Sequence, residues 1–199
     1  MSVYENEMLG LGAKLVAGAD EAGRGPLAGP IVAAAVILSP EKPIIGVNDS
    51  KKLSAKVRER LYEEIMEKAT AVGVAMISAK DIDSIGIGQA NLMVLRDAVR
   101  SLSPATDAVL SDYFKIPGLE DIMQKSIVKG DANSVSIAAA SIIAKVTRDR
   151  IMIEADELYP GYGFAKHKGY GTKAHYAAIN AQGLCEIHRR TFLRGYFNG

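Results

Sequence analysis

Hydrophobic and polar positions divide the chain into segments typical of strands and helices in mixed order. Short apolar runs predict strands over residues 15–19, 31–38, 72–77 and 108–110, with a further extended piece at 127–128. Apolar residues at helical spacing predict helices over residues 55–69, 91–102, 132–158 and 173–182. Ser54 and Thr172 are expected to cap the first and the last of these helices. This order of elements predicts an α/β layered domain, whose strand order the pattern does not give.

The length and composition of the chain suit a single domain over residues 1–199. The 199 residues are 48% hydrophobic, which is enough for one sizeable core and too little for two. Cys185 is the only cysteine, so an intramolecular disulfide and a cysteine-based zinc cage are excluded, and a reducing compartment is favoured. The sequence shows no signal-peptide pattern and no apolar run of the roughly 18 residues that a membrane span needs. We expect a cytoplasmic monomer that does not bind membranes.

Positive charge is clustered although the total charge is nearly balanced, with 24 Lys and Arg against 23 Asp and Glu. Residues 163–175 (GFAKHKGYGTKAH) contain no acid and interleave Phe164 and Tyr170 with lysines and histidines. Such a segment favours contacts with phosphates and stacking on sugars or bases, and a mobile solvated loop is the alternative. Residues 188–190 (HRR) add positive charge near the C-terminus, and residues 48–52 (NDSKK) offer a turn that could hold a phosphate.

Four acids stand where predicted elements end or begin: Asp20 and Glu21 after the first strand, Asp112 after a later strand, and Asp131 before the long helix. Carboxylate oxygens suit hard cations, so this set favours Mg²⁺ or Mn²⁺ over zinc or copper. Two such ions roughly 3.5–4 Å apart can activate a water and stabilise the leaving oxygen of a phosphodiester. Without cations the clustered carboxylates would repel one another and their pKa values would rise. The acids therefore predict a metal site if they converge in space.

Each acid also has an ordinary structural interpretation. Asp131 could be the N-cap of the long helix, and Asp20 with Glu21 could form a solvated turn. Asp112 could begin a surface loop, with competing acids nearby at Asp107, Glu120 and Asp121. Neighbouring residues of a strand point to opposite faces, so Asp20 and Glu21 can share a site only if the chain bends there, and the glycines that follow could supply the bend.

The glycine-rich turn Gly23-Arg24-Gly25 exposes backbone amides and carbonyls that no side chain shields. A nucleic-acid backbone could approach such a turn closely and present a sugar 2′-hydroxyl to it. An ordinary turn with Arg24 in solvent is the alternative. The three histidines have no zinc-like spacing, and neither a nucleophile elbow nor a phosphate-binding loop occurs, so covalent catalysis and P-loop nucleotide hydrolysis are disfavoured.

Five segments, taken together and in this order, resemble bacterial ribonuclease HII. They are residues 20–25 (DEAGRG), 48–51 (NDSK), 129–131 (KGD), 138–149 (AAASIIAKVTRD) and 167–173 (HKGYGTK). The resemblance covers nearly the whole chain. One departure is Tyr113, because members of the family usually place a glycine directly after the third acid.

The resemblance implies a ribonuclease H-like fold: a mixed central sheet flanked by helices, with a small C-terminal helical segment. It implies an endonuclease that hydrolyses the RNA strand of RNA–DNA hybrids and cuts 5′ to ribonucleotides embedded in duplex DNA. Two-metal catalysis would leave 3′-hydroxyl and 5′-phosphate ends, with Mg²⁺ or Mn²⁺ on Asp20, Glu21, Asp112 and Asp131. The resemblance also implies that residues 23–25 read the 2′-hydroxyl.

Two further contacts follow from the resemblance, in that Tyr170 would stack on a sugar and Lys51 would hold a phosphate. It connects the chain with ribonucleotide excision repair and DNA replication, and it leaves open whether a replication or repair partner such as a sliding clamp recruits the protein. Two other functions stay open: a metal-dependent nuclease of the same fold without ribonucleotide selectivity, and a catalytically silent module that binds RNA–DNA hybrids.

Overall fold

A mixed sheet of five strands forms the centre of the computed structural model, which describes residues 2–197. The strands are β1 (Val16–Ala22), β2 (Ile31–Ile37), β3 (Ala71–Ile77), β4 (Ala108–Asp112) and β5 (Met123–Ile127). Their order across the sheet is β3-β2-β1-β4-β5. The β1–β2 and β2–β3 pairs are antiparallel, whereas β1–β4 and β4–β5 are parallel. The parallel half of the sheet brings the ends of β1 and β4 together.

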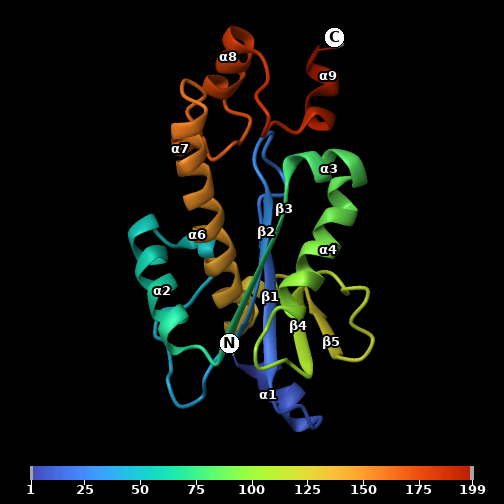
Figure 1. Ribbon diagram of the computed structural model, residues 1–199. Helices are drawn as coiled ribbons and strands as arrows, with labels where there is room; N and C mark the ends of the chain where they lie inside the picture. Colours follow the sequence, from blue (N-terminus) through green and yellow to red (C-terminus); the bar gives the residue numbers. More distant parts are fainter. Residues whose placement is uncertain (1, 198–199) are drawn as a thin grey trace.

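Helices cover both faces of this sheet, as Figure 1 shows with the sheet seen edge-on. One face packs against α6 (Val135–Leu158) and α2 (Ala55–Lys68), and the other against α4 (Ile87–Arg100) and α3 (Ala79–Ile85). The approach of α6 to β1 requires a glycine, because a Cβ atom at Gly18 would lie 2.1 Å from the backbone carbon of Ser136. This close contact fixes the start of α6 beside the strand that carries two of the candidate acids.

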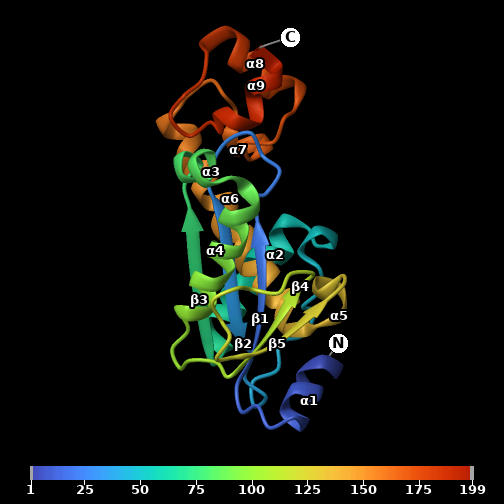
Figure 2. The ribbon, with the colours of Figure 1, turned by 90° about the vertical axis from the view of Figure 1, so that its right-hand side faces the viewer.

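A group of short helices lies beyond one end of the sheet (Figure 2). It comprises α7 (Phe164–His167), α8 (Lys173–Gln182), η2 (Arg190–Leu193) and α9 (Arg194–Phe197). Its own core includes Leu27, Met152, Phe164 and Ile179. The β1–β2 connection reaches into it, since Leu27 N donates to Gly169 O over 2.8 Å. The remaining elements are α1 (Val3–Gly10), η1 (Ser50–Lys52) and α5 (Gly130–Asn133).

The hydrophobic pattern predicted most of these elements. The strands over 31–38 and 72–77 and the helices over 55–69 and 173–182 are confirmed with shifts of one residue or none. Both predicted caps form, since Ser54 Oγ accepts from Val57 N over 3.4 Å and Thr172 Oγ1 accepts from His175 N over 3.2 Å. The mixed sheet with flanking helices and the small C-terminal helical segment are present as expected.

The predicted helix over 132–158 differs from the structure at its start. Residues Gly130–Asn133 form the separate α5, and Ser134 is extended at φ −121° and ψ 132°. Its hydroxyl accepts from Ile137 N over 3.2 Å and so begins α6 anew. The interpretation of Asp131 as the N-cap of the long helix is therefore wrong. None of the helices described is long and apolar enough to cross a membrane.

Candidate active site

The site lies where β4 ends beside β1. The two strands pair only from Val16↔Ala108 to Ala19↔Ser111, so residues 20–22 of β1 have no strand neighbour on that side. A pocket of about 340 Å³ opens there. Ligands of α/β sheets bind in such crevices beyond the carboxyl ends of strands. The predicted site residues that line the pocket are Asp20, Glu21, Gly23, Arg24, Gly25, Lys51, Asp112 and Tyr170.

Asp20 and Glu21 share the pocket without a bend between them. Strand β1 continues through both acids to Ala22, whereas the apolar run had predicted that it would end at Ala19. Asp20 lies on the α6 side and receives a hydrogen bond from Ser141, and Glu21 alternates to the other face. Both line one pocket because it opens at the strand edge that β4 has left free. The turn that was expected to bring them together begins only at Gly23, where φ is 98°.

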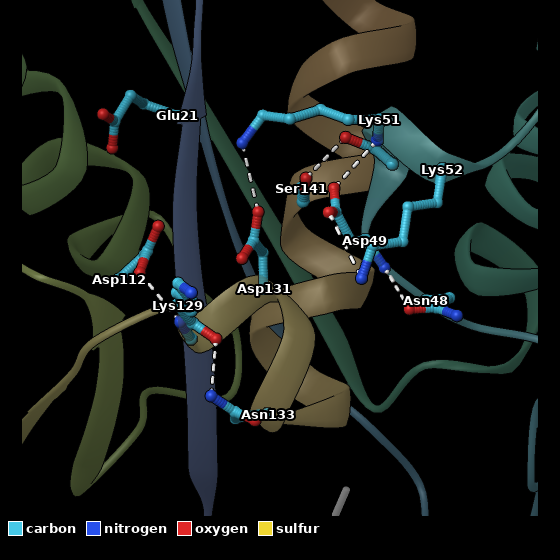
Figure 3. A network of polar contacts seen from close by, with 12 residues as sticks. Glu21, Asn48, Asp49, Lys51, Lys52, Asp112, Lys129, Asp131, Asn133 and Ser141 are labelled. Carbon is cyan, nitrogen blue, oxygen red and sulfur yellow. Dashed lines mark hydrogen bonds and ion pairs between the residues drawn. The ribbon is translucent and has the colours of Figure 1, made fainter.

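Asp112 and Asp131 are brought close by the short connection between β5 and α6. Gly130 N donates to Asp112 Oδ1 over 2.8 Å, which ties the start of α5 to the end of β4. Asp131 follows directly and is 6% exposed. It is not among the residues that line the pocket, but its Oδ2 accepts from Lys51 Nζ, which does line it, over 3.1 Å. Figure 3 shows the Asp131 carboxylate joined to the Lys51 ammonium on one side of the β1 ribbon, with Asp112 and Glu21 on the other side in this view.

Burial and mutual repulsion disfavour the charged forms of the acids on β1. Burial raises the pKa of Asp20 well above its usual range, and the charges of Glu21 and Asp112 raise it further. The pKa of Glu21 rises to about 7, first because of burial and then because of Asp112, against the opposing charges of Arg24 and Lys51. A divalent cation would remove this penalty.

The chemistry of the donors fits a hard divalent cation. All four acids offer oxygen ligands, and Ser141 adds a hydroxyl that lines the same pocket. Within residues 2–197, however, no three His, Cys, Asp or Glu side chains are arranged to hold one ion together. The Lys51 ammonium instead partly neutralises Asp131. The structure therefore gathers the acids around one region without forming a finished coordination shell.

In the turn at residues 23–25 the first position requires a glycine, whereas the second glycine has no close neighbours. A Cβ atom at Gly23 would lie 2.1 Å from Nε of Arg148, and the positive φ also disfavours a side chain there. At Gly25 a Cβ atom would meet only Cε1 of Tyr170, at 3.9 Å. A methyl group at Gly25 would thus fit in ordinary contact with Tyr170. Arg24 is half-exposed and lies 4.9 Å from the ring centre of Phe114 and 3.6 Å from Glu21, so it does not simply extend into solvent.

The basic segment over 163–175 is only partly a surface. Tyr170 is 45% exposed and lines the pocket, and Lys166 and Lys173 are exposed. Phe164 and His175 are fully buried, so the prediction that they belong to a nucleic-acid patch is wrong. The positive charge expected of residues 188–190 is also reduced at the surface, because His188 and Arg189 are buried at 2% and 0% exposure.

Several residues of the site were not predicted. Ser141, Lys145 and Arg148 line the pocket from α6, where spacings of four and three residues place them on one face. That spacing was visible in the sequence. Ser50 also lines the pocket and is 2.7 Å from Ser141 through the two hydroxyls. A second hollow, of about 530 Å³, lies between α1 and the segment after β2 and contains none of the predicted site residues.

Comparison with known proteins identifies the family. The family model described as Ribonuclease HII matches residues 17–198. The chain belongs to the ribonuclease HII family. A Ribonuclease HII from Acetivibrio thermocellus is 54% identical over 98% of this chain and 76% of its own length. One from Bacillus cytotoxicus is 56% identical over 96% of this chain and 73% of its own length. The chain is therefore a ribonuclease H, an endonuclease.

Solved structures agree with this assignment and with the expected ribonuclease H-like fold. Ribonuclease H2 from Pyrococcus horikoshii OT3 superimposes with a TM-score of 0.75 at 29% identity, covering 89% of this chain and 93% of that one. RNase HII from Archaeoglobus fulgidus, solved in complex with PCNA, gives a TM-score of 0.73 at 26% identity, covering 88% and 93%.

Tyr113, which stands where members of the family usually have a glycine, adopts a backbone conformation that favours glycine. This residue has a φ of 67°, in the left-handed region that favours glycine. Tyr113 N donates to Ile127 O over 3.0 Å, and the side chain is 68% exposed and packs edge-on against Phe114. The backbone beside Asp112 is therefore the one expected of a glycine, although the residue is a tyrosine.

Proposed function

We propose that this ribonuclease HII hydrolyses the RNA strand of RNA–DNA hybrids and cuts 5′ to ribonucleotides embedded in duplex DNA. One observation carries the proposal. Three of the four acids line the same pocket as a glycine turn that a sugar and phosphate backbone can approach closely. An acid cluster alone would suit many nucleases, whereas a backbone turn that no side chain shields, beside that cluster, supports selection of a 2′-hydroxyl.

The acids Asp20, Glu21, Asp112 and Asp131 would hold Mg²⁺ or Mn²⁺. When bound, the ions supply an activated water and stabilise the leaving 3′-oxygen, so that the products carry 3′-hydroxyl and 5′-phosphate ends. Ser141 is placed to orient the Asp20 carboxylate from α6, and Gly130 N orients Asp112. Such contacts hold ligands in position before the substrate arrives.

The substrate would contact the chain on three sides of the pocket. Residues 23–25 would approach the ribonucleotide, and Tyr170, which is half-exposed opposite Gly25, would stack on a sugar. Lys51 would hold a phosphate, because its side chain is 79% exposed and its ammonium already reaches over the acids. Lys145, which lines the pocket from α6, adds a further positive charge.

We also propose a wider setting for the enzyme. The solved complex of the Archaeoglobus fulgidus enzyme with PCNA supports a replication or repair partner for this chain, in a role in DNA replication and ribonucleotide excision repair. We infer that the protein acts in the cytoplasm as a monomer, with hybrids and ribonucleotide-containing DNA as its substrates.

The proposal is tested by cleavage of a duplex containing one ribonucleotide, with Mg²⁺, with Mn²⁺ and with a chelator. Asp20→Asn should reduce cleavage by at least a thousandfold and leave duplex binding nearly unchanged, because the lost charge belongs to the reaction and not to the binding surface. Asp121→Asn is the matched control, since this acid is exposed and pairs with Arg100. Equal activity of the two variants would contradict the assignment of Asp20.

A further inference from the structure

The side chain of Arg189 lies fully buried behind the glycine turn. Its guanidinium donates to Gly23 O over 2.6 Å, to Arg24 O over 3.0 Å and to Gly29 O over 3.0 Å. No carboxylate forms an ion pair with it among the residues described. A fork of donors with fixed geometry is thus directed entirely at backbone carbonyls.

These bonds determine which side of the turn faces the pocket. In a trans peptide the carbonyl and the following N–H point in opposite directions. Because Gly23 O and Arg24 O point to Arg189, the N–H groups of Arg24 and Gly25 point away from it. Arg24 and Gly25 line the pocket and Arg189 does not. Within residues 2–197, neither of these two N–H groups has a hydrogen-bond acceptor.

A second buried arginine packs against Gly23 and holds residues 28–30 of the same β1–β2 connection. Arg148 is 1% exposed and donates from Nε to Pro30 O over 2.9 Å and from Nη2 to Ala28 O over 3.1 Å. Its Nη1 is buried and has no partner in the described chain, and the side chain lines the pocket. Burial and the charge of Arg148 lower the pKa of Arg189 to about 9, so Arg189 remains charged at neutral pH.

Burying two cations next to one turn is costly for folding. A buried charge without a paired opposite charge destabilises a protein, and these two also repel each other. Carbonyl contacts offset only part of that cost. The two charges would have a use if they polarise the peptide groups of the turn, because the N–H groups would then bind an oxygen atom of the ligand more strongly.

We propose that Arg189 is a positioning residue that holds the Gly23 and Arg24 carbonyls, so that the N–H groups of Arg24 and Gly25 become fixed donors to the 2′-hydroxyl oxygen of the ribonucleotide. This inference rests on the proposed function. The sequence predicted that both the amides and the carbonyls of the turn would be open to the substrate. Two of those carbonyls are already bonded.

The direct test is Arg189→Lys, which keeps the charge and loses the fork. The variant should bind an all-DNA duplex within twofold of the unaltered protein, because the exposed cations are unchanged. Its kcat on a duplex with one ribonucleotide should fall about tenfold to a hundredfold, because one ammonium nitrogen cannot take the places of Nε, Nη1 and Nη2, each of which donates to a different carbonyl. Arg100→Lys is the control, since Arg100 also donates to a carbonyl, Gly118 O, over 2.8 Å but lies far from the pocket.

Hydrogen exchange in the unaltered protein provides a measurement that does not depend on whether the variant folds. The amides of Arg24 and Gly25 should be protected by the ribonucleotide duplex at least tenfold more than by the all-DNA duplex. Equal protection by the two duplexes, or full kcat in a folded Arg189→Lys variant, would overturn the positioning role. If the unaltered protein cut neither duplex, the proposed function itself would fail, which is a separate result.

Discussion

The ammonium nitrogen of Lys51 lies 3.1 Å from Oδ2 of Asp131, although 80 residues separate the two in the sequence. The lysine side chain is 79% exposed and that of the aspartate only 9%. Partial burial lowers the pKa of Lys51, but the hydrogen bond and charge of Asp131 raise it by more. A solvated cation therefore neutralises an acid that would otherwise be buried without a partner.

Replacing this cation should separate metal binding from catalysis. Lys51→Gln removes a competitor for Asp131, so Mn²⁺ should bind up to about fivefold more tightly, as expected of a half-solvated ion pair worth about 0.2–1 kcal/mol. Cleavage should fall at least tenfold, because the phosphate contact is lost. Titration calorimetry without nucleic acid measures the first effect. Lys52→Gln is the control, since Lys52 pairs with Asp49, at 4.0 Å, and not with one of the four candidate acids. Identical results for both variants would contradict this role of Lys51.

The raised pKa of Glu21 predicts that the site weakens the metal-free fold. A carboxyl whose folded pKa is about 7 instead of 4.5 contributes stability below pH 4.5 and loses it as the pH rises through 7. Glu21→Gln should therefore raise the free energy of unfolding at pH 8 by on the order of 2–3 kcal/mol, and much less at pH 4.5. Denaturant unfolding in chelator measures this, with the exposed Glu154→Gln as control. A gain that did not depend on pH would contradict the cause given.

The space beside Gly25 predicts a variant that folds but does not cut well. In Gly25→Ala the new methyl group would meet only Tyr170, at 3.9 Å, so the free energy of unfolding should change by about 1 kcal/mol or less. The methyl group would nevertheless occupy the gap that the substrate needs, and kcat/KM should fall at least tenfold. Gly88→Ala, where a Cβ atom meets nothing within 4 Å, is the control. Full activity of Gly25→Ala would show that the substrate does not enter this gap.

A buried histidine pair predicts loss of stability in acid. His188 Nε2 is 3.1 Å from His175 Nε2, and His188 Nδ1 accepts from Cys185 N over 3.0 Å. Burial and the charge of His175 lower the pKa of His188 to about 4. Stability from this group is complete above about pH 6.5, the usual pKa of histidine, and is lost as the pH falls from there to 4.

The test is the slope of the unfolding free energy against pH. His188→Gln cannot take up the proton, so between pH 6.5 and 4 the slope should be smaller than in the unaltered protein by up to about 1.4 kcal/mol per pH unit. Chemical denaturation at several pH values measures it. Parallel curves for the two proteins would show that His188 is not the group that titrates.

The hydrophobic pattern predicted local elements well because periodicity is a local property. Strand β2 is buried along its whole length, as its apolar residues indicate, and helix α8 is capped by Thr172. The strand order, by contrast, depends on pairings such as Val16 with Ala108, which lie far apart in the chain. Ser134 divides α5 from α6 through its extended backbone, and a helical pattern on both sides concealed this break.

The acids of the site were predictable, but the residues behind the turn were not. Asp20 and Asp112 stand at the ends of apolar runs, where sites usually form. Arg189 gives no such signal, because an arginine in a basic stretch is usually solvated. Only the fold shows that it lies behind Gly23 with carbonyls as its partners. His175 and Phe164 likewise resembled surface residues of a basic segment and are fully buried.

The central claim is that one pocket both selects a ribonucleotide and cuts beside it. The most direct measurement maps the product ends from a DNA duplex with a single ribonucleotide, next to the same duplex made of DNA alone, in Mg²⁺. The account predicts one cut, on the 5′ side of the ribonucleotide, with 3′-hydroxyl and 5′-phosphate ends, and no cut in the all-DNA duplex. Equal cutting of both duplexes, or a cut elsewhere, would contradict it.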